Sequence, residues 1–439
     1  MTLITAITSP AAPPAPWWRH RATLLRVVAD LLAAELASMR PGLVRRGLPW
    51  PADLDLAADL GADSLELLGL ASAMEQMLAI GCIGQGHVLD RPRLGAWADA
   101  VAAGLEGGTD VVGFRTSGSS GAPKTCTHAL AELWQESIEL ARLFPGTRRI
   151  VSLVPSHHIY GFLFSVLLPR ALGLDLDGEG EAATVADLRA VPPGAVARQL
   201  RAGDLVIGHP DFWRAFAVTA TGLPGNVVGV SSTAPCPDEV ASAVSEAGLA
   251  RLVQVYGSSE TAGVGWRDIP GEDYRLFPYW EAEAQAGSAA DIAGGPAAGA
   301  ACLTRRCADG SRRPYPLQDS LAWSGPGRFR PVKRIDQAVQ VGGTNVFPGY
   351  VADVLRMHPQ VAEVAVRLMR ADEGQRLKAF VVARADLPAA DMASLRAGLT
   401  GWIAQRLSTP ECPAAYSFGP ALPRQANGKL CDWIIEAWE

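Results

Sequence analysis

Between residues 107 and 335, short β-rich runs alternate with helical stretches. Such alternation is typical of an α/β domain built on a largely parallel sheet. The predicted strands cover residues 111–115, 150–154, 205–207, 227–230 and 252–255. We therefore expect a compact α/β core over residues 107–335, with segments of a different character before and after it.

The segment before this core is predicted to be helical. Residues 1–20 are rich in Ala and Pro, and we expect them to be disordered. Apolar residues recur at helical spacing over residues 22–38. A second helix is predicted over residues 64–78, with Asp63 as its N-cap and Glu66 completing a capping box. A third helix is predicted near residues 94–105, so residues 21–106 form an all-α region.

The segment after the core is predicted to be a small α+β unit. A helix is expected near residues 350–357, and strands are expected over residues 361–368 and 379–383. We place the boundary at Asp336, so that residues 336–439 form a separate C-terminal domain.

Composition excludes several classes of protein. The net charge is −6 and there is no long Lys/Arg run, which argues against nucleic acid as a main partner. The seven cysteines include no CxxC pair, and we expect free thiols in a reducing, cytoplasmic environment. Residues 150–169 contain no charged side chain, but Pro155, His158 and Gly161 interrupt them. We therefore predict a buried strand, a turn and a buried helix there, and no membrane span.

A loop rich in small hydroxyl residues and glycines directly follows the first predicted strand. Its backbone N–H groups and hydroxyls can surround phosphate oxygens, and its lysine adds positive charge. The spacing is not that of the GxxxxGK[ST] phosphate loop. Taken alone, such a loop is equally typical of a plain surface loop. The loop consists of Thr116, Ser117, Gly118, Ser119, Ser120, Gly121, Ala122, Pro123 and Lys124.

This loop resembles the TSGSTGxPK motif of the adenylate-forming superfamily, which includes acyl- and aryl-CoA synthetases, luciferases and peptide-synthetase adenylation domains. Six further segments resemble motifs of the same superfamily in the same order, over roughly residues 110–439. The resemblance implies ATP and Mg²⁺ as cofactors and a carboxylic acid as substrate.

Three of these segments lie in the predicted core. The segment from Pro155 to Phe162 resembles P-x-x-H-x-x-G, whose histidine, here His158, lines the carboxylate pocket. The turn Ser232-Thr233-Ala234-Pro235 resembles the family's Gly-Ala-Pro turn against adenine, with Ser232 in place of glycine. The string Tyr256-Gly257-Ser258-Ser259-Glu260 resembles Y-G-x-T-E, in which the hydroxyl residue, Ser259, meets the α-phosphate and Glu260 holds Mg²⁺.

Three more segments follow towards the C-terminus. Asp319 stands where the family's T-G-D aspartate binds both ribose hydroxyls, although Gln318 replaces the glycine. Arg334 and Asp336 resemble the hinge G-R-x-D, followed by the GGxNxxP string at residues 342–348. The string at residues 422–429 resembles L-P-R-x-x-x-G-K, whose lysine, Lys429, bridges the carboxylate and the α-phosphate.

The chemistry agrees with this order. Joining a carboxylate to a phosphorus centre brings two anions together, so the site needs cations where charge builds up. Lys124, Lys429 and Mg²⁺ on Glu260 supply them from three segments. Each residue alone has a plainer interpretation: Lys429 as a tail lysine, Glu260 as a surface carboxylate and His158 as a core histidine. The order of seven motifs favours the catalytic interpretation.

The helical region resembles a different family. Residues 60–68, LGADSLELL, are close to the acyl carrier protein signature LGxDSL, in which the serine carries phosphopantetheine. Ser64 would place that phosphate at the positive end of a helix. The alternative is a carrier-like bundle that only braces the catalytic core. Both hypotheses stay open at this point.

The substrate is expected to be a small aromatic acid, such as a hydroxybenzoate. The GGTNVFP string resembles that of benzoate and hydroxybenzoate ligases, and aromatic side chains surround the predicted acid site. The acceptor is a carrier thiol or CoA, and a fused carrier favours a secondary-metabolite pathway. The predicted pocket contains His158, Tyr160, Phe162, Phe212, Trp213, Val230 and Tyr256.

Two alternatives belong to other classes of protein. One is a non-catalytic adenylate-binding scaffold, and the other is a carrier module with a degenerate ligase domain. Retention of Lys124, Glu260, Asp319 and Lys429 together argues against both. The prediction is therefore an acid–thiol ligase that forms an acyl-adenylate.

Overall fold

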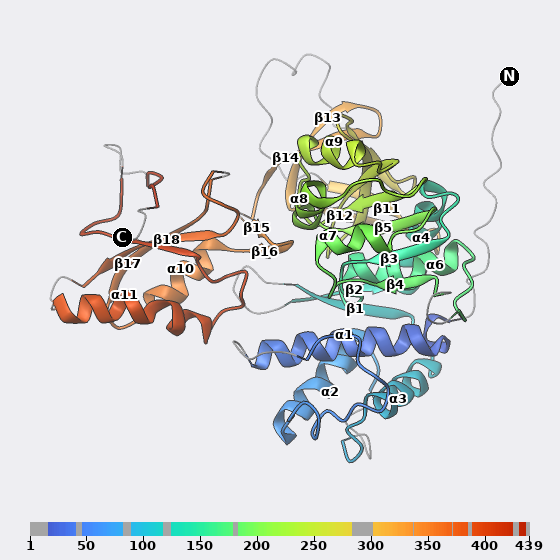
Figure 1. Ribbon diagram of the computed structural model, residues 1–439, viewed down its shortest axis with the longest axis horizontal. Helices are drawn as coiled ribbons and strands as arrows, with labels where there is room; N and C mark the ends of the chain where they lie inside the picture. The colour runs from blue at the N-terminus through green and yellow to red at the C-terminus, as the bar shows by residue number, and fades with distance from the viewer. Residues whose placement is uncertain are drawn as a thin grey trace.

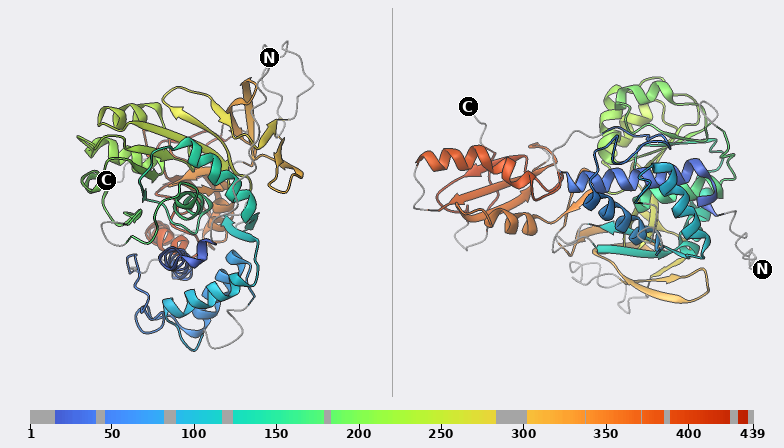
Figure 2. Two further views of the ribbon diagram at one scale, coloured as in Figure 1. Left: turned by 90° about the vertical axis from the view of Figure 1, so that its right-hand side faces the viewer. Right: turned by 90° about the horizontal axis from the view of Figure 1, so that it is seen from below.

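The computed structural model describes residues 16–40, 46–81, 89–116, 124–178, 183–282, 302–336, 338–370, 372–384, 389–424 and 430–435. Figure 1 shows three parts: helices near the N-terminus, a core around a large sheet, and a small C-terminal domain at one side. Figure 2, seen from below, shows the three N-terminal helices lying against the core while the small domain extends away from it.

The N-terminal helices start and end close to where their sequence patterns predict. The capping box is formed, because Asp63 accepts from the Glu66 N–H at 2.8 Å and Glu66 accepts from the Asp63 N–H at 2.9 Å. Helix α1 lies between the core and the other two helices (Figure 1). These elements are η1 (Trp17–Arg19), α1 (Arg21–Met39), α2 (Ser64–Leu78) and α3 (Leu94–Glu106).

A nine-stranded sheet forms the centre of the core, in the order β13-β14-β9-β8-β7-β6-β5-β3-β4. Five strands are parallel, and four of them were predicted: β3 (Arg149–Ser152), β5 (Asp204–Gly208), β6 (Val228–Ser231) and β7 (Arg251–Ser258). The fifth, β4 (Val185–Asp187), was not predicted. The sheet then continues with four antiparallel strands that the sequence did not predict: β8 (Ala262–Ile269), β9 (Tyr274–Leu276), β13 (Asp319–Gly325) and β14 (Arg328–Arg334). The prediction of a largely parallel sheet therefore holds for only one half of it.

The strand predicted at residues 111–115 is not part of this sheet. It is β1 (Val111–Thr116), and it pairs antiparallel with β2 (Lys124–Ala129) in a separate hairpin. A small third sheet contains β10 (Trp280–Ala282), β11 (Cys302–Arg306) and β12 (Arg312–Pro316). The helical elements of the core are α4 (Leu130–Leu143), α5 (Ile159–Phe162), η2 (Leu163–Leu167), α6 (Leu168–Ala171), α7 (Pro193–Val196), η4 (Ala197–Gln199), α8 (Pro210–Thr219) and α9 (Asp238–Glu246).

The charge-free stretch at residues 150–169 is buried inside the protein, as predicted. It forms β3, a turn and the helical run that begins at Ile159. In the part of the chain that the structure describes, no helix combines the length and the apolar character that crossing a membrane requires.

The N-terminal helices share one hydrophobic core with the sheet. Trp17 packs edge-on against Phe162 of α5 at 5.3 Å between ring centroids, and Phe114 of β1 packs against the same ring at 5.5 Å. Leu24 and Leu32 of α1 are fully buried in this cluster. The helices therefore do not pack as a separate domain.

The C-terminal domain has a hydrophobic core of its own. Its fully buried Lys378 donates to Glu373 and to the carbonyl of Trp433, both at 2.7 Å, and so fixes the last described residues to the sheet. Hydrogen bonding to Lys378, opposed by burial, lowers the pKa of Glu373 to about 2. The elements are β15 (Val339–Val341), β16 (Thr344–Val346), α10 (Pro348–Arg356), β17 (Val361–Leu368), β18 (Leu377–Ala383), α11 (Ala389–Ala404) and β19 (Ala415–Phe418).

The shared core predicts how the N-terminal helices unfold. Replacing the fully buried Leu32 by Ala should destabilise the protein by about 2–5 kcal/mol, the usual cost of such a cavity. Calorimetry should show that the main unfolding transition, which includes the sheet, shifts to a lower temperature in this variant. Replacing Leu65, which is 77% exposed on α2, should leave that transition in place. A separate transition that alone responds to Leu32→Ala would show that the helices fold independently.

Candidate active site

Three of the predicted motifs lie just after parallel strands. His158 follows β3, Thr233 follows β6, and Glu260 follows β7. Because β3, β5, β6 and β7 are neighbouring parallel strands, their carboxyl ends lie along one edge of the sheet. Such an edge is where open α/β sheets bind ligands.

The predicted ribose site is formed by β7 and β13. The Tyr256 hydroxyl donates to Asp319 Oδ2 at 2.6 Å. The Tyr256 ring packs against Tyr274 and Phe329, with centroids 5.6 and 5.5 Å away. Burial, followed by the charge of Asp319, raises the pKa of Tyr256, so the hydroxyl stays protonated as a donor. This hydrogen bond fixes the carboxylate of Asp319 against β7.

Strand β13 leads to the predicted hinge through its neighbour β14. Asp319 faces Arg334 across the β13–β14 register, and Arg334 makes two hydrogen bonds to Asp336, at 2.8 and 2.5 Å. Burial opposes the charge of Asp336, but the Arg334 guanidinium holds the pKa of that carboxyl below its usual value. The residue predicted as hinge is thus ion-paired to the end of β14.

The predicted adenine turn is held by side chains and lies against the C-terminal domain. Ser232 donates to the Val255 carbonyl at 2.8 Å, and Gln254 donates to the Ala234 carbonyl at 2.9 Å. Thr233 adopts a left-handed backbone, with φ +76°. A Cβ placed on Gly343, in the β15–β16 hairpin, would lie 3.0 Å from Thr233 Oγ1. The hairpin of the GGTN string therefore contacts this turn.

A tight turn presents the predicted magnesium ligand. Ser258 Oγ accepts from the N–H groups of Glu260 and Thr261, both at 3.2 Å. The Thr261 hydroxyl is 3.2 Å from the Ser258 N–H and closes the turn from the other side. Glu260 is exposed at the tip, while Thr261 is buried. The carboxylate thus points away from the packed core.

Three buried side chains hold this turn from behind, and the sequence analysis identified none of them. His128 on β2 hydrogen-bonds the Ser259 carbonyl at 2.6 Å, which joins the phosphate-loop hairpin to the turn. Arg305 donates to the Thr261 carbonyl at 3.3 Å, and Glu136 accepts from the Gly263 N–H at 3.0 Å. Glu136 offered a signal, as a carboxylate between Leu133 and Leu140 on the buried face of α4, whereas the strands that carry His128 and Arg305 are largely polar.

The predicted phosphate loop is described only at its ends. Thr116 and Lys124 are register partners at the mouth of the β1–β2 hairpin, and Lys124 is exposed. Ser117, Gly118, Ser119, Ser120 and Gly121 lie outside the described residues, as does Lys429. The segment beside Lys429 is fixed, because Leu430 bridges Arg424 and accepts a hydrogen bond from Arg367 on β17 at 2.7 Å.

Among the residues predicted to bind the carboxylic acid, His158 is accessible to solvent and several others are buried. The side chain of His158 is exposed to solvent, but the dense protein around it disfavours the charged imidazolium and lowers its pKa. The buried Tyr160 donates to the carbonyls of Gly208 and Val230, at 3.0 and 3.2 Å. Burial holds the pKa of Tyr160 well above its usual value, so it stays neutral. These bonds connect α5 to the ends of β5 and β6.

Several residues predicted in the acid pocket have the contacts of core residues. Val230 and Phe162 are fully buried, and Phe162 packs between Trp17 and Phe114. Trp213 is also fully buried and donates to the Val230 carbonyl at 3.0 Å. Their part in acid binding stays a prediction.

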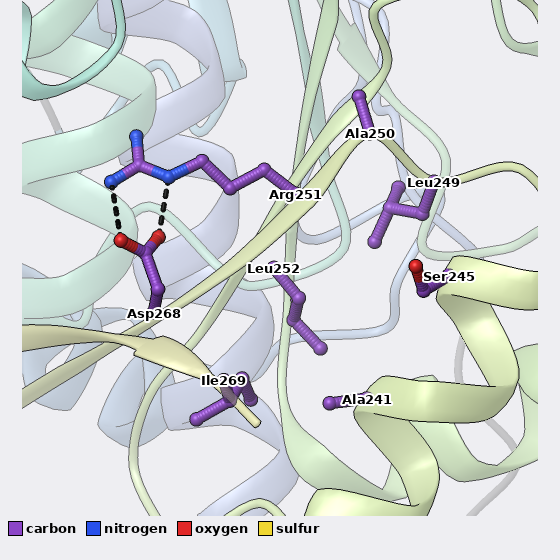
Figure 3. A pocket seen from close by; sticks show the side chains of 8 residues that line it. All are labelled: Ala241, Ser245, Leu249, Ala250, Arg251, Leu252, Asp268 and Ile269. Atoms are coloured by element: carbon purple, nitrogen blue, oxygen red, sulfur yellow. Dashed lines mark hydrogen bonds and ion pairs between the residues drawn. The ribbon is translucent and has the colours of Figure 1, made fainter. Parts of the chain in front are cut away.

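Two cavities contain none of the predicted site residues. One, of about 360 Å³, is at the amino end of β7, where Arg251 pairs with Asp268 (Figure 3). The other, of about 320 Å³, lies between α1 and β4. Glu260 is at the opposite end of β7 from the first cavity, so that cavity does not adjoin the predicted metal ligand.

The described residues contain no cluster of three or more potential metal ligands. A single carboxylate such as Glu260 nevertheless suits Mg²⁺, which keeps several waters and is bound through one or two carboxylates plus substrate phosphates. The six described cysteines are free thiols. The site therefore fits Mg²⁺ brought in with a nucleotide better than a resident metal centre.

The buried support of the turn makes a testable prediction. Arg305→Met should weaken Mg²⁺-dependent ATP binding by about 10-fold or more, because the carbonyl of Thr261 loses its donor and Glu136 loses its neighbouring cation. Calorimetry with and without Mg²⁺ measures the effect. The exposed neighbour Arg306 offers the control Arg306→Met, which should bind normally. Unchanged affinity in a folded Arg305 variant would remove Arg305 from the site's support.

Comparison with known proteins agrees with this geometry. The profile of the AMP-binding enzyme family matches residues 114–279, and that of the AMP-binding enzyme C-terminal domain matches residues 350–429. The chain is 38% identical over 416 residues to a 4-coumarate--CoA ligase of Halorhodospira halophila, covering 93% of this chain and 98% of the relative. It is 39% identical to the 4-coumarate--CoA ligase of Rhodobacter capsulatus, covering 85% of this chain and 90% of the relative.

Solved structures show the same fold. The amide bond synthetase McbA from Marinactinospora thermotolerans matches with a TM-score of 0.59 at 18% identity, covering 92% of each chain. Full-length similarity to named ligases, together with matches to both family profiles, establishes the class. The chain belongs to the AMP-binding, adenylate-forming enzyme family, and it is an acid–thiol ligase that produces AMP.

Proposed function

We propose that this ligase activates a small aromatic carboxylic acid of the coumarate type with Mg·ATP and transfers the acyl group to CoA. The observation that supports this most is the near full-length similarity to proteins named 4-coumarate--CoA ligase, at 36–39% identity. The alignment with the Halorhodospira relative includes α2, α3 and the core. The coumarate skeleton also fits the aromatic acid expected from the sequence.

The first step joins the acid to the α-phosphate and releases pyrophosphate. Asp319, held by Tyr256, would accept hydrogen bonds from the ribose hydroxyls. Thr233 and Ala234 would form the turn against adenine, Ser259 would lie beside the α-phosphate, and Lys124 would act from the mouth of the phosphate loop. Mg²⁺, held through Glu260, would neutralise charge on the phosphates. His158 would face the acid, and Lys429 would stand between the two anions.

The second step is thiol attack on the acyl-adenylate, with AMP as the leaving group. We assign the switch between the steps to rotation of the C-terminal domain about Asp336, so that Lys429 serves only the first. The ion pair of Arg334 with Asp336 supports a defined pivot at the end of β14. In the present arrangement the domain touches the core through Gly343 at Thr233, and through Gln375, which accepts from Arg214 at 2.9 Å.

CoA is preferred to a built-in carrier thiol as the acceptor. The alignment with the Halorhodospira relative leaves at most 7% of this chain, about 31 residues, unmatched, so α2 and α3 lie inside the similarity to a CoA ligase. The shared core gives α1–α3 a bracing role. The carrier hypothesis keeps one observation in its favour: Ser64 is exposed at a capped helix start, beside the exposed Leu65 and Leu68.

A substrate panel tests the proposed reaction. The protein should catalyse acid-dependent ATP–pyrophosphate exchange with 4-coumarate and related aromatic acids at least about 10-fold faster than with long-chain fatty acids or amino acids. With CoA present, chromatography should show the aryl-CoA thioester and AMP in equal amounts. Exchange without any thioester would exclude CoA as the acceptor, and a preference for fatty acids would overturn the aromatic assignment.

Intact-mass analysis decides between the two acceptors. Incubation with CoA and a broad phosphopantetheinyl transferase should leave the mass unchanged if the helices only brace the core. A shift by one phosphopantetheine arm, absent from Ser64→Ala, would establish the carrier hypothesis instead. In both cases Ser64→Ala should keep full pyrophosphate exchange, because the adenylation residues begin at Thr116.

A further inference from the structure

Helix α1 carries a buried carboxylate that bonds the loop before the predicted acid-binding histidine. Asp30 is 2% exposed, although its neighbours Ala29 and Leu31 are apolar and buried. Asp30 Oδ2 accepts from both the N–H and the hydroxyl of Ser156, at 2.7 and 2.6 Å. Its other oxygen accepts from Arg189 at 2.5 Å. One residue of the N-terminal region thus binds the loop after β3 and the loop after β4.

Holding two segments together does not require such an arrangement. A buried carboxylate costs several kcal/mol unless it is paired and hydrogen-bonded, and well-packed apolar side chains often replace such pairs without loss of stability. What the carboxylate adds is a fixed relative position of the two loops, because the three donors from Ser156 and Arg189 must meet its two oxygens in one geometry. Arg189 is in turn fixed by a second ion pair, with Asp187 at the end of β4.

The segment that this network fixes carries the predicted acid-binding histidine. Ser156 precedes His157 and His158, whose rings lie 4.2 Å apart. The same segment is pressed against α5, because a Cβ on Gly161 would lie 2.0 Å from the Pro155 carbonyl oxygen. Held by Asp30 on one side and by α5 on the other, the backbone before His158 has little freedom. Asp30 and Arg189 are also the charged groups that act on His158, in opposite directions.

We propose that Asp30 is a positioning residue for acid binding: through Ser156 and Arg189 it sets the place of His158, so that α1 forms part of the active site. The inference rests on the proposed function, since it requires His158 to face the acid. It assigns to the N-terminal helices a role in catalysis that neither a carrier nor a simple brace would have. The nucleotide residues lie on other elements, so the effect should be confined to the acid.

Kinetics of the full-length variants Asp30→Asn and Ser156→Ala test this role. Each should raise the KM for the acid in pyrophosphate exchange by about 10-fold, equivalent to about 1.4 kcal/mol, and should leave the KM for ATP within about twofold. The double variant should be little worse than the worse single one, because both act through one network. The acid used is whichever gives exchange with the unmodified protein, so failure of the aromatic assignment is seen separately.

Arg40→Gln is the matched control. Arg40 lies at the end of α1 and pairs with Glu66 of α2, with both side chains about one-fifth exposed. Its other hydrogen bonds go to the carbonyls of Leu60 and Gly61, and not to the loop after β3. It should lower the unfolding temperature and leave both KM values unchanged. If the acid KM of Asp30→Asn moves no more than that of Arg40→Gln, or if the KM for ATP rises equally, Asp30 is only structural. Should Asp30→Asn fail to fold, Ser156→Ala, which removes one oxygen, decides by the same criteria.

Discussion

Strand β7 is the element on which the site depends. It pairs in parallel with β6 and antiparallel with β8, so the sheet changes direction at this strand. The reversal requires a very close approach of the chain to itself, since a Cβ on Gly257 would lie 2.1 Å from the Ala262 carbonyl oxygen. The register shift beside Gly257 places Tyr256 against Asp319 and leaves Glu260 at the tip of the turn. The residues predicted to contact ribose, the α-phosphate and Mg²⁺ are therefore arranged by one strand and its turn.

Buried charges provide the remaining rigidity. Arg305 and Glu136 hold the turn after β7 from behind, and Asp30 holds the loop after β3. Each of these side chains bonds main-chain N–H or C=O groups of a loop, and those groups must be satisfied once they are buried. Loops at the edge of a sheet lack the strand partners that would do this. The polar network thus supplies the order that backbone pairing gives elsewhere.

Local patterns predicted α1, α2, α3, α10 and four of the five parallel strands because their signals are local. The start of α2 needs only Asp63 and Glu66, three residues apart, and the structure contains that capping box. The antiparallel half of the sheet could not be predicted in this way. Its strands β13 and β14 form a hairpin, but β14 joins the rest of the sheet through β9, more than 50 residues earlier, and no period within one strand specifies such a partner. The strand at Val111 was counted with the parallel strands, whereas it pairs with β2, the next strand along the chain.

The motifs could locate the candidate site but not its support. A family motif marks residues that would touch a ligand, whereas Asp30, His128 and Arg305 would act through the backbone of those residues. The burial of such side chains depends on elements more than a hundred positions away, as for Asp30 with Ser156 and His128 with Ser259. Only the packed structure shows that the carboxylate of Asp30 in α1 is buried against a loop and is not exposed to solvent.

The position of the C-terminal domain is linked to the nucleotide site by geometry. Gly343 lies so close to Thr233 that any larger residue there would press on the turn predicted to hold adenine. A ligand at that turn would either contact the hairpin or displace it, so its affinity would differ between the two domain positions of the proposed rotation. Differential affinity of this kind is what allows a ligand to shift a conformational equilibrium. In the proposed rotation, the C-terminal domain would therefore respond to the contents of the site through its contact with the core, and Asp336 would need only to provide the pivot.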